Sequence, residues 1–176
     1  MLNIRRLFGS SSAVPVGAAA VLSCALYAGS LANGFVFDDT AYLSTPALLG
    51  LDWAELILGN WRGLDLYRPL TLLSLAIDHA LWGAAERGQL AAAGFHGTNV
   101  ALHGGAVLLV GQLAHSLHPD RRAAFVAAVA FGAHPLLSEV VGWISTRGDL
   151  LSTALVLAGL VAHLRYRETG NGGGRW

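Results

Sequence analysis

The chain has 176 residues, of which 54% are hydrophobic and only 12% are charged, about half of the roughly 25% charged content of an average soluble domain. Eleven acidic residues balance eleven arginines and no lysine is present, so no basic surface is available for nucleic acid. The single cysteine, Cys24, excludes a disulfide framework and a cysteine-based metal site. This composition predicts an all-α, multi-pass membrane protein.

The first predicted span runs from Ala13 to Asn33 and carries no charged side chain, which gives about 20 residues for the bilayer core. Arg5 and Arg6 precede it, so residues 1–12 are predicted to be cytoplasmic. A cleaved signal is the alternative, because Arg5-Arg6 faintly resembles a twin-arginine start. Against it, the apolar stretch exceeds the roughly 7–15 residues of a typical signal core.

Residues 34–95 carry too many charges for a span and are predicted to form a long extracytoplasmic loop. Within the loop, apolar residues with helical spacing follow Pro69, a residue suited to the first turn of a helix: Leu70, Leu73, Ile77 and Leu81. Tryptophans lie in the same stretch. The pattern predicts helices that lie along the membrane surface.

Three further spans are predicted at Thr98–Leu117, Ala123–Val141 and Leu150–Leu164. The second of these crosses only if it continues through His134-Pro135, where proline kinks or ends a helix. About four crossings place six arginines in the cytoplasm: Arg5, Arg6, Arg121, Arg122, Arg165 and Arg167. The expected location is the cytoplasmic (inner) membrane, with a Gly-rich cytoplasmic tail at residues 169–176.

The acidic pair Asp38-Asp39 directly follows the first span. One interpretation is an acidic helix start, because aspartate is a favoured N-cap residue. The other is a general base at the outer membrane boundary that takes a proton from a hydroxyl acceptor while a lipid-linked donor approaches from the bilayer.

Several other polar residues are candidate contacts for a phosphate or a neighbouring helix. Arg68 either binds a donor phosphate or reaches lipid headgroups. Glu139 and Arg147 either stabilise a hairpin as an ion pair or hold an anionic leaving group. His96 and His103 lie two turns apart, so they predict contacts between helices, and no metal site is expected.

In order along the chain, these motifs resemble the N-terminal membrane region of the protein O-mannosyltransferases that carry tetratricopeptide repeats, within the GT-C superfamily. The resemblance covers residues 13–168 and rests on these residues: Phe35-Val-Phe-Asp-Asp39, Tyr67-Arg-Pro-Leu70, Phe95-His96, Asn99, His103, His134-Pro135, Glu139, Trp143, Ser145, Arg147, Asp149, Leu150 and Leu151.

The resemblance implies transfer of a sugar, mannose in the eukaryotic relatives, from a polyprenyl-phosphate donor to a hydroxyl of a protein or glycan acceptor outside the membrane. It implies that Asp38 is the catalytic base and Asp39 its partner. It places Arg68, His134, Glu139 and Arg147 around the donor phosphate. It implies no firm cofactor beyond the lipid-linked sugar, and a divalent metal requirement stays open.

The chain departs from the family in lacking further spans and the 34-residue repeats, so it is expected to be an N-terminal fragment of a longer enzyme. A second hypothesis is a non-catalytic membrane module that binds lipid headgroups or partner helices. A transporter or channel piece is less consistent with ionisable residues gathered at the ends of the spans.

Overall fold

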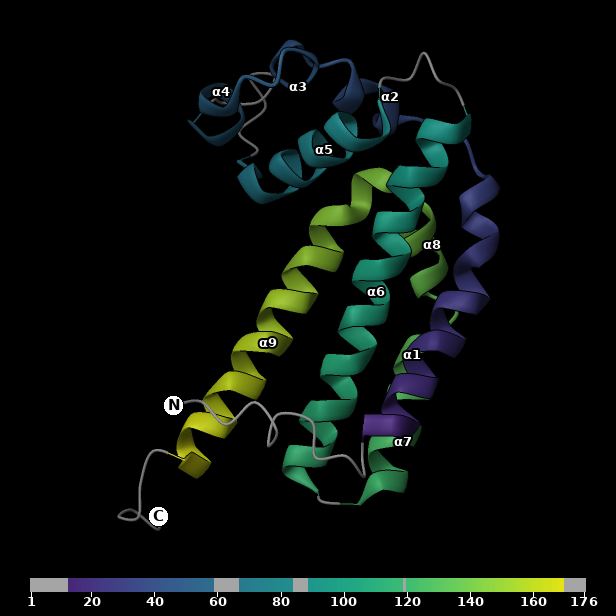
Figure 1. Cartoon of the computed structure of the whole chain (residues 1–176), viewed down its shortest axis with the longest axis vertical. Helices are drawn as coiled ribbons and strands as arrows, with labels where there is room; N and C mark the ends of the chain where they lie inside the picture. Colours follow the sequence, from purple (N-terminus) through teal and green to yellow (C-terminus); the bar gives the residue numbers. More distant parts are fainter. Residues whose placement is uncertain (1–12, 59–66, 84–88, 119, 170–176) are drawn as a thin grey trace. The chain divides into compact units, whose positions relative to one another are not determined.

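The computed structural model describes residues 13–58, 67–83, 89–118 and 120–169, and all regular structure in these ranges is helical (Figure 1). The all-α prediction is therefore confirmed. The elements in chain order are α1 (Ala13–Tyr27), the 3₁₀ helix η2 (Ala28–Ala32), α2 (Asp38–Leu43), α3 (Pro46–Leu49), α4 (Trp53–Leu58), α5 (Pro69–Trp82), α6 (Gln89–Leu117), α7 (Arg121–Gly132), α8 (Leu137–Gly142), the 3₁₀ helix η4 (Ile144–Thr146) and α9 (Arg147–Thr169). Arg5, Arg6 and most of the Gly-rich tail lie outside the described residues.

Local sequence signals explain where the shorter helices begin. Pro46 and Pro69 occupy the first turns of α3 and α5. Proline is tolerated there because a backbone N–H in the first turn has no acceptor within the helix. Asp52 accepts the Glu55 N–H at 3.1 Å at the start of α4. Asp120 accepts a backbone N–H in the same way at the start of α7, at 2.8 Å.

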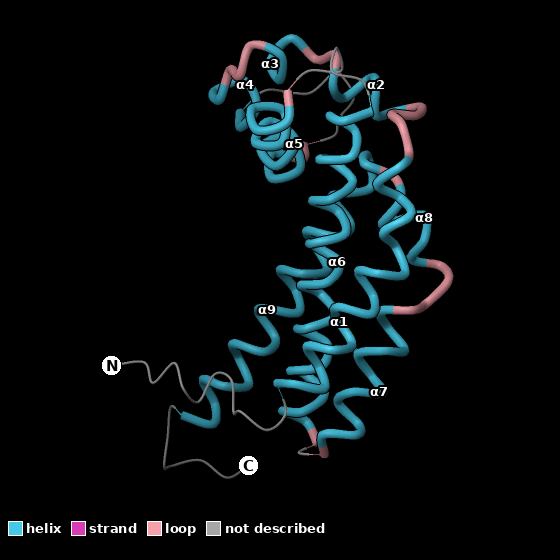
Figure 2. Tube along the Cα trace, turned by 45° about the vertical axis from the view of Figure 1, so that its right-hand side comes forward, coloured by secondary structure: helices cyan, strands magenta, loops and turns pink. Residues whose placement is uncertain are grey.

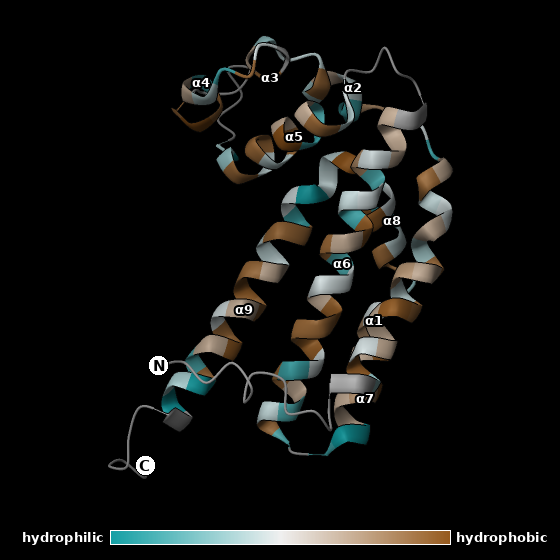
Figure 3. Cartoon of the chain, in the orientation of Figure 1, coloured by the Kyte–Doolittle hydropathy of each residue, from teal (hydrophilic) through white to brown (hydrophobic). Residues whose placement is uncertain are grey.

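Within the described residues, three helical segments are long and apolar enough to cross a membrane: Pro15–Ala32, Ala91–Leu117 and Ile144–Arg167. Figure 3 shows hydrophobic residues along the length of α1, α6 and α9. The membrane prediction is thus supported at three of the four expected positions. Helix α6 begins at Gln89, so the predicted loop of residues 34–95 ends earlier than expected.

The expected span from Ala123 to Val141 is not one continuous helix. Helix α7 ends at Gly132, and α8 begins only at Leu137, with a loop between them (Figure 2). Pro135 lies in this loop, and proline cannot donate the backbone hydrogen bond that a continuing helix needs. At about 1.5 Å per residue, the 12 residues of α7 are too short to cross the bilayer core alone.

One compact unit contains the described residues within 1–26, 103–134 and 152–176. Its apolar core is formed by Val16, Ala19, Ala20, Val107, Ala124 and Ala128. Small residues allow close helix contact, since a Cβ added at Gly111 would lie 2.4 Å from Val16 Cγ1. The Gly132 carbonyl accepts hydrogen bonds from Ser23 Oγ at 2.9 Å and His103 Nε2 at 3.1 Å.

The second unit contains the described residues within 27–102 and 135–151. Helices α3 and α4 contact α5, and the core includes Leu48, Leu56, Leu72, Leu75, Phe95 and Ile144. Helix α5 is apolar on two faces. Leu72 and Leu75 are buried in the core. Of the face identified from sequence spacing, Leu70, Ile77 and Leu81 are all more than half exposed, whereas Leu73 packs against the core.

Candidate functional site

The acidic pair lies at the start of α2, and its two carboxylates have different environments. Asp38 is exposed, whereas Asp39 is fully buried. Both belong to the first turn of α2, where the unpaired N–H groups of a helix favour negative charge. The structure therefore leaves Asp38 open to solvent and encloses Asp39.

The pair belongs to a tight turn formed by residues 36–39, called the acidic turn below. The Asp39 N–H donates to the Val36 carbonyl at 2.9 Å, which closes a four-residue turn. Phe37 has φ 45° and ψ −117°, close to the first central position of a type II′ turn, where glycine is favoured. Holding a residue with a Cβ there costs about 1–3 kcal/mol. Despite its size, Phe37 is 85% exposed, and its ring meets that of Trp143 edge-on at 6.5 Å.

Asp39 holds this turn against the segment that precedes α9. Its Oδ2 accepts the Val36 N–H at 3.1 Å. Its Oδ1 accepts both the Ser145 N–H at 2.9 Å and the Ser145 hydroxyl at 2.6 Å. Three donors satisfy a buried carboxylate well, so Asp39 holds the backbone that carries Asp38.

Arg147, two residues after Ser145, is completely buried at the start of α9. Its guanidinium forms an ion pair with Asp78 Oδ2 at 2.5 Å. Nε donates to Asn99 Oδ1 at 2.8 Å and Nη2 donates to the Phe95 carbonyl at 2.8 Å. Nη1 also lies 3.1 Å from Ser74 Oγ. In this geometry the guanidinium is bound by protein acceptors from α5 and α6, not held open for a phosphate.

Asp78 receives a second partner, because the Thr98 hydroxyl donates to its Oδ1 at 2.8 Å. Burial raises the pKa of the Asp78 carboxyl above its ordinary value, while the neighbouring Arg147 and Thr98 act in the opposite direction. In the folded state Asp78 therefore takes up a proton at a higher pH than in the unfolded chain.

The remaining predicted phosphate contacts are all exposed. Arg68 immediately precedes α5 and Glu139 lies in the first turn of α8, both in the second unit. His134 follows the end of α7 in the first unit. The structure brings Asp39 and the Ser145–Arg147 segment together. Phosphate binding by Arg68, His134 and Glu139 stays a prediction, whereas the buried Arg147, also predicted to contact the phosphate, has its guanidinium bound by protein groups instead.

Of the two histidines of α6 expected to contact other helices, His96 is fully buried and His103 contacts α7, while Asn99 between them makes a further contact. Asn99 Nδ2 donates to the Trp143 carbonyl at 3.0 Å, while its oxygen accepts from Arg147. His103 contacts the Gly132 carbonyl. Among the described residues, no group of three or more His, Cys, Asp or Glu side chains is arranged to hold a metal ion.

Sequence reasoning assigned no role to four residues of this network: Ser145, Asp78, Ser74 and Thr98. Asp78 carried a usable signal. It stands in α5 on the same side as Leu75, and a charged residue on the packed face of a helix requires a partner. Ser145 offered no comparable signal beyond its place in the motif with Trp143 and Arg147.

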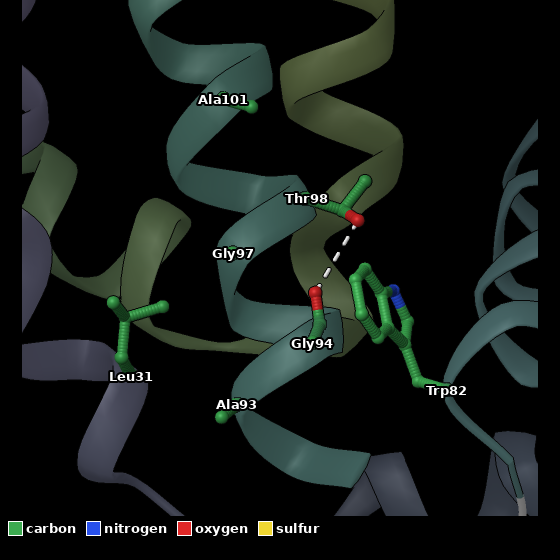
Figure 4. Close-up of a pocket in the computed structure, with 7 residues that line it drawn as sticks. All are labelled: Leu31, Trp82, Ala93, Gly94, Gly97, Thr98 and Ala101. Carbon is green, nitrogen blue, oxygen red and sulfur yellow. Dashed lines mark hydrogen bonds between the residues drawn. The ribbon is translucent and has the colours of Figure 1, made fainter. Parts of the chain in front are cut away.

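An open, mostly apolar groove of about 500 Å³ lies along the first turns of α6. Small residues form its floor, and Leu31 and Trp82 flank α6 on opposite sides (Figure 4). Gly94 is required at its position, because an added Cβ would lie 2.3 Å from Trp82 Cγ. The groove can accept a slender apolar group.

Several curated proteins match most of the chain. Protein O-mannosyl-transferase Tmtc2 of Drosophila melanogaster is 30% identical over 163 residues, or 85% of this chain. Protein O-mannosyl-transferase TMTC1 of Mus musculus is 34% identical over 175 residues, or 91% of this chain. Protein O-mannosyl-transferase Tmtc1 of Drosophila melanogaster is 32% identical over 157 residues, or 84% of this chain.

The chain spans only 17–18% of the length of these three relatives. No family model matches it, and no solved structure matches it. The relatives nevertheless carry the name that the ordered motifs indicated, so the resemblance is confirmed. Over most of its length, this chain is a homologue of one segment of the protein O-mannosyl-transferases.

Proposed function

We propose that the chain contributes the acidic site of a membrane glycosyltransferase that moves a mannosyl-type sugar from a polyprenyl-phosphate donor to a hydroxyl group of a protein acceptor. The observation that carries the proposal is the exposed Asp38 on a strained turn that buried Asp39 holds in place. The naming of its homologues as protein O-mannosyl-transferases agrees with it.

In the proposed reaction, the acceptor hydroxyl oxygen attacks the anomeric carbon of the donor sugar. The bond between that carbon and the phosphate oxygen breaks, so polyprenyl phosphate leaves with the bonding electron pair. Asp38 takes the hydroxyl proton, and the configuration at the anomeric carbon is inverted. Arg68 and Glu139, both exposed, stay candidates for contacts near the donor phosphate.

A lipid-linked donor suits the physical setting of the chain. In the part of the chain that the structure describes, three helices are apolar enough to cross a membrane, and the groove on α6 has a mostly apolar lining beside Trp82. An isoprenoid chain is slender and apolar, so such a groove can hold part of it. The open face of α5 is proposed to rest against the bilayer surface.

The proposed topology keeps four crossings, with the N-terminus in the cytoplasm and the acidic turn outside. The third crossing is proposed to run from α7 through Pro135 into α8, because α7 alone, with 12 residues, is too short to cross the bilayer core. A broken helix is tolerated in a membrane when the freed backbone groups find partners. The hydrogen bonds to Gly132 from Ser23 and His103 provide them.

The test is sugar transfer in membranes of cells that express the protein, with polyprenyl-phosphate mannose as donor and a serine- and threonine-rich peptide as acceptor. Asp38→Asn should lower the transfer rate by at least about 100-fold, the lower range for loss of a general base. Asp52→Asn is the matched control, because asparagine preserves the N-cap of α4. Unchanged transfer in Asp38→Asn would contradict the proposal.

The alternative is a non-catalytic membrane module that binds lipid headgroups. The open apolar face of α5 favours it, because that face needs only a lipid surface. Under this alternative the wild-type protein transfers no mannose, while Leu81→Asp weakens its binding to vesicles that contain anionic lipid.

A further inference from the structure

We infer that Ser145 is a positioning residue for the acidic turn, and that the buried Asp78–Arg147 ion pair fixes Ser145 in place. The inference rests on the proposed function, because the turn matters for catalysis only if Asp38 is the base. It assigns roles to Ser145 and Asp78, and it gives Arg147 a role other than contact with the donor phosphate.

The first step is that the turn needs support from outside itself. Phe37 occupies a backbone conformation that favours glycine, so the turn is strained. Within the turn, the hydrogen bonds are those between Val36 and Asp39. Strained conformations persist only where their surroundings hold them in place.

The second step is that Ser145 supplies this support. Its N–H and its hydroxyl both donate to the same oxygen, Asp39 Oδ1, at 2.9 and 2.6 Å. Both residues are buried, so water does not compete for these bonds. The other carboxylate oxygen remains free to accept the Val36 N–H. One buried carboxylate thereby joins the turn to η4.

The third step is that η4 is itself fixed by Arg147, which follows it directly. The guanidinium binds Asp78 and Ser74 on α5 and Asn99 on α6, and it lies 5.8 Å from the centre of the Phe95 ring. Asn99 also holds the Trp143 carbonyl on the other side of η4. Ser145 is therefore held from both directions along the chain.

The experiment compares Ser145→Ala with the wild-type protein by amide hydrogen exchange and by transfer kinetics. The variant removes only the hydroxyl and keeps the backbone donor. Exchange of the Val36 and Asp39 amides should become at least about tenfold faster, the factor expected when a hydrogen bond to a carboxylate is lost. The turnover number should fall by a similar factor while KM for the donor stays within about twofold.

Ser138→Ala is the matched control, because the Ser138 hydroxyl donates to the nearby Pro135 carbonyl and does not touch Asp39. It should change neither measurement. Exchange in α4 serves as the internal reference for intact folding of the second unit.

The outcomes separate the inference from the proposed function. Unchanged exchange at Val36 and Asp39 in Ser145→Ala overturns the inference, whatever the activity. Faster exchange with undiminished turnover also overturns it. Faster exchange in a protein whose wild type transfers no sugar rejects the proposed function, and with it the catalytic part of the inference, while the support of the turn by Ser145 stands.

Discussion

At the scale of single residues, adjacent side chains have opposite environments. Asp38 and Asp39 are neighbours in the sequence, yet one is exposed and the other is fully buried with three hydrogen-bond donors. Because successive residues in the first turn of α2 point in different directions, the Asp38 side chain faces outward and the Asp39 side chain faces inward. Under the proposed function, proton transfer and support of the turn are thereby divided between two identical side chains.

Arg147→Met tests the buried ion pair. The substitution leaves the Asp78 charge without its cation, and removing one member of a buried pair destabilises a protein by about 3–5 kcal/mol. Burial already raises the pKa of Asp78, and the loss of Arg147 raises it further. In the folded variant, Asp78 therefore takes up a proton at a higher pH than it does in the unfolded chain.

The measurement is thermal unfolding in detergent micelles at pH 7 and pH 5. The deficit of Arg147→Met relative to wild type should be smaller at pH 5, because protonation of Asp78 removes the unpaired charge. Arg121→Met is the control. Arg121 is exposed in the first turn of α7, so this variant should lose under about 1 kcal/mol with no comparable change with pH. An equal deficit of Arg147→Met at both pH values would count against the role given to Asp78.

At the scale of elements, the sequence predicted the features that depend on the spacing of apolar residues and on the position of proline. The helical class, the start of α5 at Pro69 and the interruption at Pro135 follow from local backbone chemistry. The early start of α6 did not, because its first residues lie beside charged ones that mask the apolar pattern. The ion pair between Asp78 and Arg147 joins positions 69 residues apart, and no local pattern specifies such a contact.

The candidate site, too, could be predicted from the sequence only in part. The acidic pair was found from its position after the first span. The separation of its two roles, and the use of Arg147 inside the protein, depend on tertiary contacts with Ser145 and Asn99. A sequence shows that an arginine is costly to bury, but it does not show whether the partner is a ligand or an aspartate.

Close contact between α1 and α6 is tested with two glycines of α6. Gly111→Ala places a Cβ 2.4 Å from Val16 Cγ1, a stiff β-branched side chain, and should destabilise the protein by about 1–3 kcal/mol. Gly105→Ala meets nothing within 4 Å and should stabilise α6 by up to about 1 kcal/mol. The measurement is the unfolding midpoint of each variant, compared with that of the wild-type protein in the same detergent. A shift of the same sign in both would show that packing against Val16 does not determine the effect.

At the scale of the whole molecule, the number of crossings determines the side of the membrane that the end of α9 faces. Four crossings return Arg167 to the side of the N-terminus, whereas three crossings leave it on the side of the acidic turn. Six arginines placed on one side favour four.

Cysteine labelling distinguishes the two topologies. In a Cys24→Ala background, exposed Leu58 and exposed Arg167 are each replaced by cysteine in separate variants. A membrane-impermeant maleimide added outside intact cells should label Leu58→Cys, and it should label Arg167→Cys only after the membrane is opened. Labelling of Arg167→Cys in intact cells would establish an odd number of crossings.

The shared carbonyl at the end of α7 implies an order of assembly. Helix α7 is too short to enter a bilayer as an independent span, and its terminal carbonyl is satisfied only by side chains of α1 and α6. Both of those helices leave the ribosome before α7 does. The nascent chain therefore completes the partners of this short helix before the helix itself is made, and a mutation at Ser23 or His103 should lower the yield of inserted protein before it lowers the stability of the folded protein.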